Sequence, residues 1–495
     1  MRYGTALAGA VVVAAASFVA VARPHRQAVG RGRSTTDLDD WALAGRANGG
    51  LILWCVLGGT IFTAYTFLAV PGVVHSSGGV GFYALAYTTI VFPLALLVLP
   101  RLTGIARRHG YVSGADLIRG SYRSPGLALA VALTGILATM PYIALQLVGL
   151  RAVLAALGLE LHGLGSDLAL VAIFAVLALS TYRHGLAAPT PVAVLKAVLV
   201  ILAAATLIVL VSRQHSWSTI AASAQAALED RALTLWPPPE HGLAYASLAV
   251  GSALALFAFP HVLMVALSAR SERTVAVTLP AMLGWTLLLG VFAVMGVVAA
   301  AVGIEVPSGR SDLAIPLLIE RLASPWLAGL LLGVIAVAAL VPAAVMSIGV
   351  ATLFARNVYV EYVNRGASSA HEVKVARLMS LLVKLGALGF ALGFQNQSAI
   401  HLHLLGAAWV LQTLPPLLLT LAPRRPGRTA LLSGWAVGMV SSTAMVTLGG
   451  FSPTVDVPGA GPVYAGVAAL TLNIVTVWAV EAGGRVLWSE SRVRP

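Results

Sequence analysis

Long runs of apolar residues, each ended by charged residues, glycine or proline, dominate the pattern along this chain. A membrane-spanning helix needs about 20 mostly apolar residues. About 13 runs satisfy this, and we predict a transmembrane helix for each. The runs are 3–22, 51–74, 80–100, 125–157, 168–182, 189–211, 243–269, 275–303, 326–354, 378–394, 400–422, 430–450 and 463–482. The pattern therefore predicts an all-helical polytopic membrane protein.

Composition supports this prediction. Hydrophobic residues make up 59% of the 495 residues and charged residues only 10%, whereas a soluble surface needs roughly a quarter to a third charged residues. This composition therefore disfavours three classes of protein: a cytosolic enzyme, a nucleic-acid-binding protein and a disordered chain. The single cysteine, Cys55, excludes an intramolecular disulfide and a cysteine-based metal cluster.

The net charge of +13 reads as a topology signal, because short cytoplasmic loops retain Lys and Arg. With the N-terminus outside, 23 of the 31 basic residues lie on one side of the membrane. An odd number of spans then places the basic C-terminal tail in the cytoplasm. Run 3–22 also resembles a cleaved signal peptide, but cleavage would leave the Arg-rich stretch from Arg23 to Arg46 outside. We therefore expect a retained helix in the plasma membrane.

Two runs contain helix-breaking residues at corresponding positions. The second run holds Gly58-Gly59-Thr60 and Pro71-Gly72, and the seventh holds Gly251-Ser252 and Phe259-Pro260-His261. Broken helices five spans apart are typical of transporters built from two inverted repeats, although Gly and Pro are also simply frequent in membrane helices. The predicted organisation is 1–50, an N-terminal helix and basic linker; 51–211, the first repeat; 212–242, an external loop; 243–422, the second repeat; and 423–495, two helices and a basic tail. The loops 212–242 and 304–325 are long enough for short interfacial helices.

No Asp or Glu lies in the middle of a predicted span, since Asp167, Glu240 and Glu481 are all at span ends. Proton pumps and antiporters commonly relay protons through buried carboxylates. Backbone carbonyls, hydroxyls and the charge of the substrate itself would have to hold any cation at this depth. This favours an anionic or zwitterionic substrate.

Several motifs occur in order from about residue 37 to the last span. They are Asp39-Asp40-Trp41-Ala-Leu-Ala-Gly-Arg46, Gly59-Thr60-Ile61-Phe62-Thr63-Ala64-Tyr65-Thr66-Phe67 with Val70-Pro71-Gly72, Pro141-Tyr142-Ile143-Ala144-Leu145-Gln146, Pro260-His261, Ala339-Leu-Val-Pro-Ala-Ala-Val-Met-Ser347, Phe354-Ala-Arg-Asn357 and Gly406-Ala-Ala-Trp409-Val-Leu-Gln412-Thr. Together these motifs resemble the sodium:solute symporter family and most closely bacterial monocarboxylate permeases. The resemblance implies a LeuT-like core of five plus five inverted-repeat helices and secondary transport of a small solute.

The resemblance also implies a Na⁺ site between the second and ninth spans. Neutral oxygens suit this hard cation. Where the family usually has a second hydroxyl this chain has Ile348, and where the branch often has Asp it has Thr60. Carried over residue by residue, the ligands are the carbonyls of Gly59, Phe62 and Ala344 and the hydroxyl of Ser347. The Ser347 hydroxyl could instead form a hydrogen bond with the backbone of its own helix.

Polar side chains beside the breaks are the candidate substrate contacts. An aromatic face with a few donors suits a small organic acid, whose carboxylate is also attracted to half-helix N-termini. The tyrosines could equally be packing residues, and the imidazole of His261 could stay neutral and bond a carbonyl that Pro260 leaves without a donor. The candidates are Tyr65, Thr66, Tyr142, Gln146 and His261.

Other charged and titratable residues receive simpler interpretations. Lys196 and Lys384 each lie about seven residues, roughly 10 Å, from the cytoplasmic end of a span, close enough to snorkel or to form a structural pair. Arg151 is interpreted as a charge at a helix end. His401 and His403 are two residues apart on a helix and therefore face different directions, which disfavours a metal site.

We therefore expect a secondary active transporter that takes up a small monocarboxylate by alternating access, coupled to Na⁺. One alternative is a sodium-independent or proton-driven carrier of the same fold, which Ile348 and Thr60 suggest. Another is a membrane-embedded sensor, although the C-terminal tail is short for a signalling domain. An enzyme is disfavoured because the chain lacks a mid-membrane carboxylate pair, an HExxH motif and a Ser/His/Asp set. No motif indicates a cofactor or a nucleotide. The expected partners are the solute and the lipid bilayer, without nucleic acid.

Overall fold

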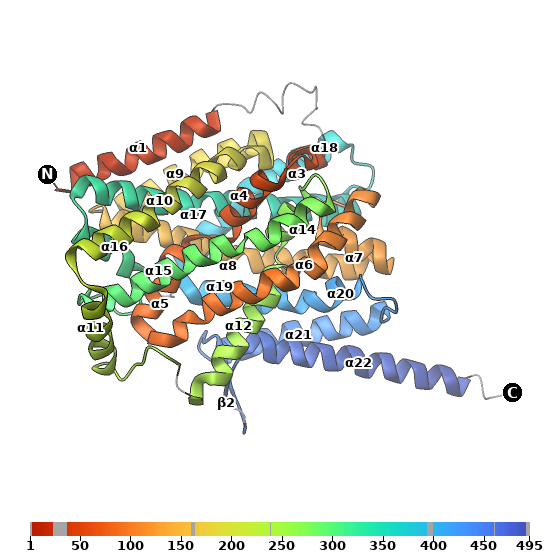
Figure 1. Cartoon of the computed structure of the whole chain (residues 1–495). Coiled ribbons are helices and arrows are strands. Elements are labelled where there is room, and N and C mark those ends of the chain that lie inside the picture. Colours follow the sequence, from red (N-terminus) through yellow and green to blue (C-terminus); the bar gives the residue numbers. More distant parts are fainter. Residues whose placement is uncertain are drawn as a thin grey trace.

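Helices run side by side in roughly one direction through the molecule (Figure 1). This computed structural model describes residues 2–22, 37–159, 164–237, 239–393, 399–459 and 461–491. Most of the basic linker, residues 23–36, and the tail arginines Arg492 and Arg494 lie outside the described residues. The loop helices α11 (Trp217–Glu229) and α16 (Ala314–Leu322) lie at one end of the bundle, and the short helices α3 (Leu38–Leu43) and α7 (Gly114–Tyr122) lie at the opposite end.

Every one of the 13 apolar runs forms a helix or a broken helix. Within the described residues, eight helices are long and apolar enough to cross a bilayer, or nine when the bent pair α12–α13 counts as one span. The exact number of crossings therefore stays a prediction. The elements are α1 (Arg2–Ala22), α4 (Gly50–Ile61) with η2 (Tyr65–Ala69) and α5 (Val70–Ser77), α6 (Tyr83–His109), α8 (Pro125–Ala156), α9 (Leu164–His184), α10 (Pro189–Gln214), α12 (Gly242–Leu256) with α13 (Pro260–Leu267), α14 (Glu272–Ala281) with α15 (Leu283–Ala301), α17 (Pro325–Leu353), α18 (Ser369–Gly393), α19 (Ala399–Val410) with η8 (Leu411–Thr413) and α20 (Leu414–Leu419), α21 (Arg428–Leu448) and α22 (Ala465–Ser491).

Short elements connect these helices. The two long loops contain the helices α11 and α16, which confirms that each can hold a short helix. A small antiparallel hairpin, which the apolar pattern did not indicate, pairs Thr454 with Tyr464 and precedes α22. The connecting elements are α3 (Leu38–Leu43), η1 (Ala44–Arg46), η3 (Gly78–Phe82), α7 (Gly114–Tyr122), η4 (Gly185–Ala187), α11 (Trp217–Glu229), η5 (Pro239–His241), η6 (Ser311–Leu313), α16 (Ala314–Leu322), η7 (Phe354–Val363), β1 (Thr454–Val457) and β2 (Gly461–Tyr464).

Both predicted helix breaks are present. Between α12 and α13 the axis bends by 47°, and Phe259 has the extended backbone (φ −62°, ψ 132°) that favours a following proline. In the second run the helix ends at Ile61, and Phe62 is extended (φ −89°, ψ 96°). The first break thus falls a few residues after Gly58 and Gly59.

Gly58 and Gly59 allow neighbouring helices to pack closely against α4, and the break itself lies after them. A Cβ at Gly58 would meet the indole of Trp285 from α15, and one at Gly59 would lie 3.2 Å from the Cβ of Ala193 in α10. Small residues let membrane helices approach this closely. α4 is therefore held against α10 and α15 immediately before it breaks.

α17 forms the centre of the bundle and is buried along most of its length. It contacts α1, α4, α8, α10, α13 and α18. α1 packs along α17 through small residues, since a Cβ at Gly329 would meet the carbonyl oxygen of Ala6, and one at Gly9 would lie 2.7 Å from the Trp326 carbonyl oxygen.

The α1–α17 contact predicts an asymmetric response to bulky substitutions. Gly329→Leu should destabilise the protein by about 1–3 kcal/mol, because the side chain has no room against α1. Gly4→Leu, where a Cβ would meet nothing within 4 Å, is the matched control and should leave stability nearly unchanged. Thermal unfolding midpoints of the purified proteins in detergent measure both. Equal midpoints for the two variants would contradict this packing.

Candidate functional site

The α4 break leaves backbone N–H groups that an unbroken helix would have used. Gln146 from α8 accepts a hydrogen bond from the Ala64 amide through Oε1 (3.1 Å). Its Nε2 donates to Thr63 Oγ1 (3.2 Å) and to the Tyr142 carbonyl (3.1 Å). Thr63 Oγ1 in turn accepts from the Tyr65 amide (3.1 Å). The donor side of the break is thus completed by a side chain from another helix.

Lys196 from α10 completes the acceptor side. Its Nζ donates to the carbonyl oxygens of Gly59 (2.8 Å) and Phe62 (2.7 Å), which the break leaves without helical donors, and to that of Ala338 in α17 (2.9 Å). The side chain is fully buried, with 0% exposure. This burial contradicts the snorkelling interpretation of Lys196 and leaves the alternative, a side chain held in structural contacts.

The Ala338 carbonyl is available because of Pro342. In a helix the amide four residues later would normally bond this carbonyl, but proline has no N–H. Pro342 lies inside α17, four residues after Ala338. One proline and one helix break therefore create the acceptors that converge on the Lys196 ammonium.

The four predicted Na⁺ ligands lie in two different environments. The carbonyls of Gly59 and Phe62 both accept from Lys196. Ala344 and Ser347 lie in continuous α17, where the Ser347 hydroxyl donates to the Ala343 carbonyl (2.6 Å). Ile348 is fully buried and offers no side-chain oxygen.

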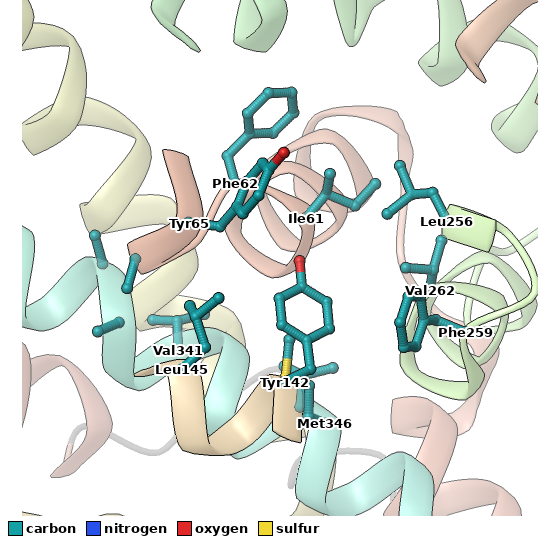
Figure 2. Packing of buried hydrophobic residues seen from close by; sticks show 14 of the residues in the cluster. Ile61, Phe62, Tyr65, Tyr142, Leu145, Leu256, Phe259, Val262, Val341 and Met346 are labelled. Carbon is teal, nitrogen blue, oxygen red and sulfur yellow. The ribbon is translucent and has the colours of Figure 1, made fainter. Parts of the chain in front are cut away.

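An aromatic and imidazole cluster lies between the two breaks. The Tyr142 ring is 5.2 Å from that of Phe259, 5.5 Å from His261 and 4.7 Å from His403, and His403 is 4.5 Å from Tyr65. Figure 2 shows Tyr142 between the α4 break, with Phe62 and Tyr65, and the α12–α13 break, with Phe259. We call Tyr65, Tyr142, Phe259, His261 and His403 the central cluster.

The central cluster contains buried polar atoms that lack partners. Within the described residues, both ring nitrogens of His261 and Nδ1 of His403 make no hydrogen bond. His261 is in the first turn of α13, where the positive end of the helix dipole lies. Buried polar groups are usually hydrogen-bonded, and the central cluster is therefore where a polar ligand would gain most.

The sequence-based candidates are distributed over two structural roles. The structure brings Tyr65, Tyr142 and His261 together in the central cluster. Gln146 already donates to Thr63 in the α4 break and to the Tyr142 carbonyl of its own helix. Thr66 is buried in η2, one residue beyond Tyr65.

Sequence reasoning missed Phe259 and His403 as members of the cluster. His403 was considered only as a metal ligand with His401, and within the described part of the chain no three His, Cys, Asp or Glu side chains could share a metal ion. The spacing of two residues between His401 and His403 could have indicated this role. It turns His403 toward the interior, while His401 lines an outer cavity.

That outer cavity, of about 770 Å³, lies beside the central cluster. Basic and titratable side chains border it, including Arg231, His75, His241 and His401. Tyr83 also lines it, and the Tyr65 hydroxyl donates to the Tyr83 hydroxyl (3.0 Å). The Tyr65–Tyr83 pair therefore separates the cavity from the cluster, and the cavity is suited to attract anions.

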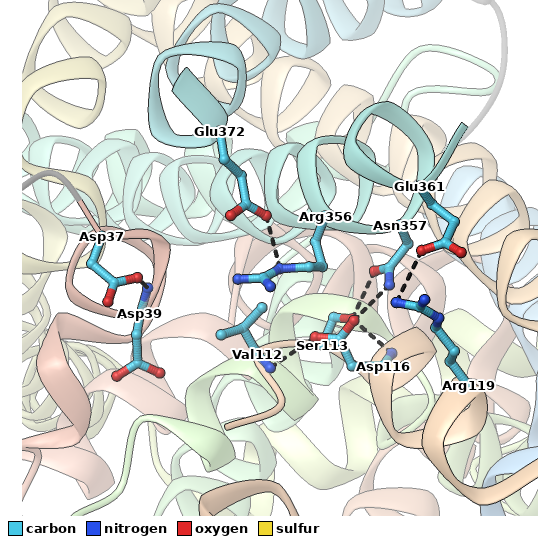
Figure 3. Close-up of polar contacts among 10 residues, drawn as sticks. All are labelled: Asp37, Asp39, Val112, Ser113, Asp116, Arg119, Arg356, Asn357, Glu361 and Glu372. Carbon is cyan, nitrogen blue, oxygen red and sulfur yellow. Dashed lines mark hydrogen bonds and ion pairs between the residues drawn. The ribbon is translucent and has the colours of Figure 1, made fainter. Parts of the chain in front are cut away.

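At the opposite end, a polar network joins α7, η7 and α18 (Figure 3). Asp116 accepts from Asn357 Nδ2 (2.7 Å) and from the Val112 amide (3.0 Å). Ion pairs Arg119–Glu361 (2.9 Å) and Arg356–Glu372 (2.8 Å) flank it. Burial raises the pKa of the Glu372 carboxyl, which lies before the predicted span 378–394, and Arg356 opposes that shift. This network ties α7, η7 and α18 together at the second end of the bundle.

Two further charged residues form structural contacts. Lys384 is buried and donates to Thr181 Oγ1 (3.1 Å) and the Ser380 carbonyl (3.0 Å), which confirms a structural pair and not an exposed, snorkelling side chain. Arg151 is also buried and forms an ion pair with Asp167 (2.5 Å). Arg151 is thus a neutralised helix-end charge.

A helical membrane bundle whose two broken helices face a shared polar cluster is the architecture of a secondary transporter. The chain belongs to the sodium:solute symporter family, whose model matches residues 41–438. It is accordingly a multi-pass membrane transporter and not an enzyme.

Individual relatives support this assignment. A monocarboxylate transport permease protein of Rhizobium johnstonii is 42% identical over 90% of both chains. A monocarboxylic acid transporter of Corynebacterium glutamicum is 25% identical, over 87% of this chain and 82% of the relative. Among solved structures, a Na⁺-coupled sialic acid symporter superimposes with a TM-score of 0.75 at 15% identity, over 96% of both chains. That likeness shows the LeuT-like fold that the family resemblance implied.

The contacts of Gln146 predict a specific loss of stability. Gln146→Met keeps the length of the side chain but leaves the Ala64 amide and Thr63 hydroxyl without these partners, which should cost about 1–3 kcal/mol. Gln225→Met is the control, because this exposed side chain bonds only Glu229 one turn away on α11. Thermal unfolding midpoints measure both effects. A Gln146→Met protein as stable as Gln225→Met would contradict the role of Gln146 in the break.

Proposed function

We propose that the chain is a secondary active transporter that takes up a small monocarboxylate by alternating access. The observation that carries the proposal is the central cluster, where aromatic rings surround the unpartnered ring nitrogens of His261 and His403. Such a cluster offers a few hydrogen bonds within an apolar enclosure, which suits a solute with one polar end and a small apolar body.

The charge of the site favours an anion. Among the described residues, the buried acidic side chains are Asp116, Asp312 and Glu372, and all three lie in loops or helix ends. A cationic solute would therefore find no counter-charge in the cluster. A carboxylate would find imidazoles and the N-terminus of α13. The monocarboxylate transport permease of Rhizobium johnstonii, at 42% identity, supports the same class of substrate.

The two ends of the structure support alternating access as the mechanism. The outer cavity reaches Tyr83, next to the central cluster, while the Asp116–Asn357 network ties together the opposite end. Opening that network while the α4 and α12–α13 halves close over the solute would expose the cluster to the other side.

We propose the plasma membrane as the location, with the N-terminus outside and the C-terminus in the cytoplasm. Arg46, Arg119, Arg356 and Arg425 all bond groups at the end of the bundle that contains α3 and α7. The enrichment of basic residues at this end supports its cytoplasmic orientation.

Membership of the family favours Na⁺ as the coupling ion, and Gly59, Phe62, Ala344 and Ser347 are the ligands that the sequence resemblance implies for it. A carrier of the same fold that works without sodium is the second candidate. The hydrogen bonds from Lys196 to two of these four residues favour it.

Uptake by the reconstituted full chain tests the proposed substrate. We expect radiolabelled lactate, pyruvate or acetate to enter proteoliposomes, and His261→Leu to reduce the uptake by about 10–100-fold, since a hydrogen bond to a charged group contributes about 1.5–3 kcal/mol. His184→Leu, at an exposed position near the end of α9, should transport normally.

A panel of amino acids and sugars completes this experiment. Uptake of a sugar or of proline without any monocarboxylate uptake would overturn the substrate proposal. An unchanged rate in His261→Leu would overturn the assignment of the central cluster as the substrate site.

A further inference from the structure

The Lys196 ammonium lies where the sequence predicts a sodium ion. An ammonium group has three N–H donors, and three carbonyl oxygens at 2.7–2.9 Å accept them. These distances are those of ordinary strong hydrogen bonds. The group also lies 5.7 Å from the centre of the Phe67 ring, within the range of a cation–π contact. The environment is therefore complete for an ammonium.

We propose that the Lys196 ammonium is the resident cation of this site, so that the chain moves its solute without binding sodium between α4 and α17. This inference deepens the proposed function, and the test that measures monocarboxylate uptake rests on that function. The test that measures sodium binding does not depend on which solute the chain transports.

The remaining oxygens do not fit a sodium ion beside Lys196. Of the four predicted ligands, Gly59 and Phe62 already bond the ammonium. This leaves the Ala344 carbonyl and the oxygen of the Ser347 hydroxyl, which donates its hydrogen to the Ala343 carbonyl, while Ile348 supplies no side-chain oxygen; two oxygens are too few for a sodium ion. Thr60, the other nearby hydroxyl, donates to the Val56 carbonyl of its own helix (2.6 Å). A sodium ion would have to displace Lys196 to gain its ligands.

Charge leads to the same conclusion. Two cations that share the same carbonyls repel each other unless an anion lies nearby. The buried acidic groups in the described residues already have other partners: Asp116 bonds Asn357, Asp312 pairs with Arg310 and Glu372 pairs with Arg356. The ammonium is thus the one positive charge that these neutral carbonyls can stabilise.

The ammonium also supplies the mechanical link expected of a bound sodium ion. Through Lys196, α10 joins the end of α4 to the middle of α17. This link is covalently attached to the chain and does not depend on the sodium concentration. Solute uptake should therefore be insensitive to a sodium gradient.

The primary experiment measures binding of radioactive sodium to the purified full chain, together with thermal unfolding in sodium chloride and in choline chloride at equal ionic strength. The wild-type chain should show no saturable sodium binding and the same unfolding midpoint in both salts. In Lys196→Ala/Ile348→Ser, which removes the ammonium and adds the missing hydroxyl, the midpoint should fall in choline and be partly restored by sodium. Saturable sodium binding to the wild-type chain that Ser347→Ala abolishes would overturn the proposal.

Lys384→Ala is the matched control, because Lys384 is also buried but bonds Thr181 and Ser380 away from the α4 break. It should lose stability without any sodium-specific recovery. Equal recovery by sodium in this variant and in the double variant would count against the proposal. If the double variant does not fold, the wild-type binding measurement still decides the question.

Transport provides the second readout. Monocarboxylate uptake by the wild-type chain should change less than about twofold when choline replaces sodium, below the 5–150-fold effects typical of coupled sites. A larger dependence on sodium would overturn the inference and leave the proposed substrate intact. Absence of monocarboxylate uptake in both salts would refute the proposed function, while the sodium-binding result would still test the role of Lys196.

Discussion

The structure depends on how a helix can be broken inside a membrane. Hydrocarbon offers no hydrogen bonds, so every backbone group released by a break needs a partner within the protein. At the α4 break, Gln146 accepts a hydrogen bond from the Ala64 amide, and Lys196 donates hydrogen bonds to the Gly59 and Phe62 carbonyls. The donor and acceptor sides of one break are thus completed by side chains from two other helices.

This arrangement explains how the central cluster is positioned. Gln146 lies one helical turn after Tyr142 on α8, and its Nε2 bonds the Tyr142 carbonyl. The contact that completes the break therefore also fixes the residue at the centre of the cluster. On the other side, Pro342 releases the Ala338 carbonyl, which connects α17 to the same ammonium. The same contacts therefore satisfy the broken backbone and position the proposed substrate site.

Much of the fold could be predicted from local patterns. The 13 apolar runs become helices because a run of about 20 apolar residues favours a helix that spans the bilayer. The pairs Gly58–Gly59 and Phe259–Pro260 marked the two broken helices, although the glycines at the first break make room for Trp285 and Ala193. Tyr65 and His261 could be identified as candidates because they lie next to the breaks, and Tyr142 because it lies on a neighbouring span.

The rest depends on contacts between residues far apart in the sequence. Lys196 was interpreted by its distance along α10 from the membrane surface, but its partners Gly59 and Phe62 are more than 130 residues away. His403 and Phe259 likewise join the cluster through helix packing that no motif records. The side of a helix that faces a neighbour, and the groups that neighbour presents, determine these roles.

The most direct test of the account is a high-resolution cryo-electron microscopy map of the full chain prepared in sodium chloride. We predict density for an ordered Lys196 side chain whose Nζ lies 2.7–2.9 Å from the carbonyl oxygens of Gly59, Phe62 and Ala338, with no separate ion between them. A separate ion between these carbonyls, with the Lys196 side chain turned away from them, would contradict it.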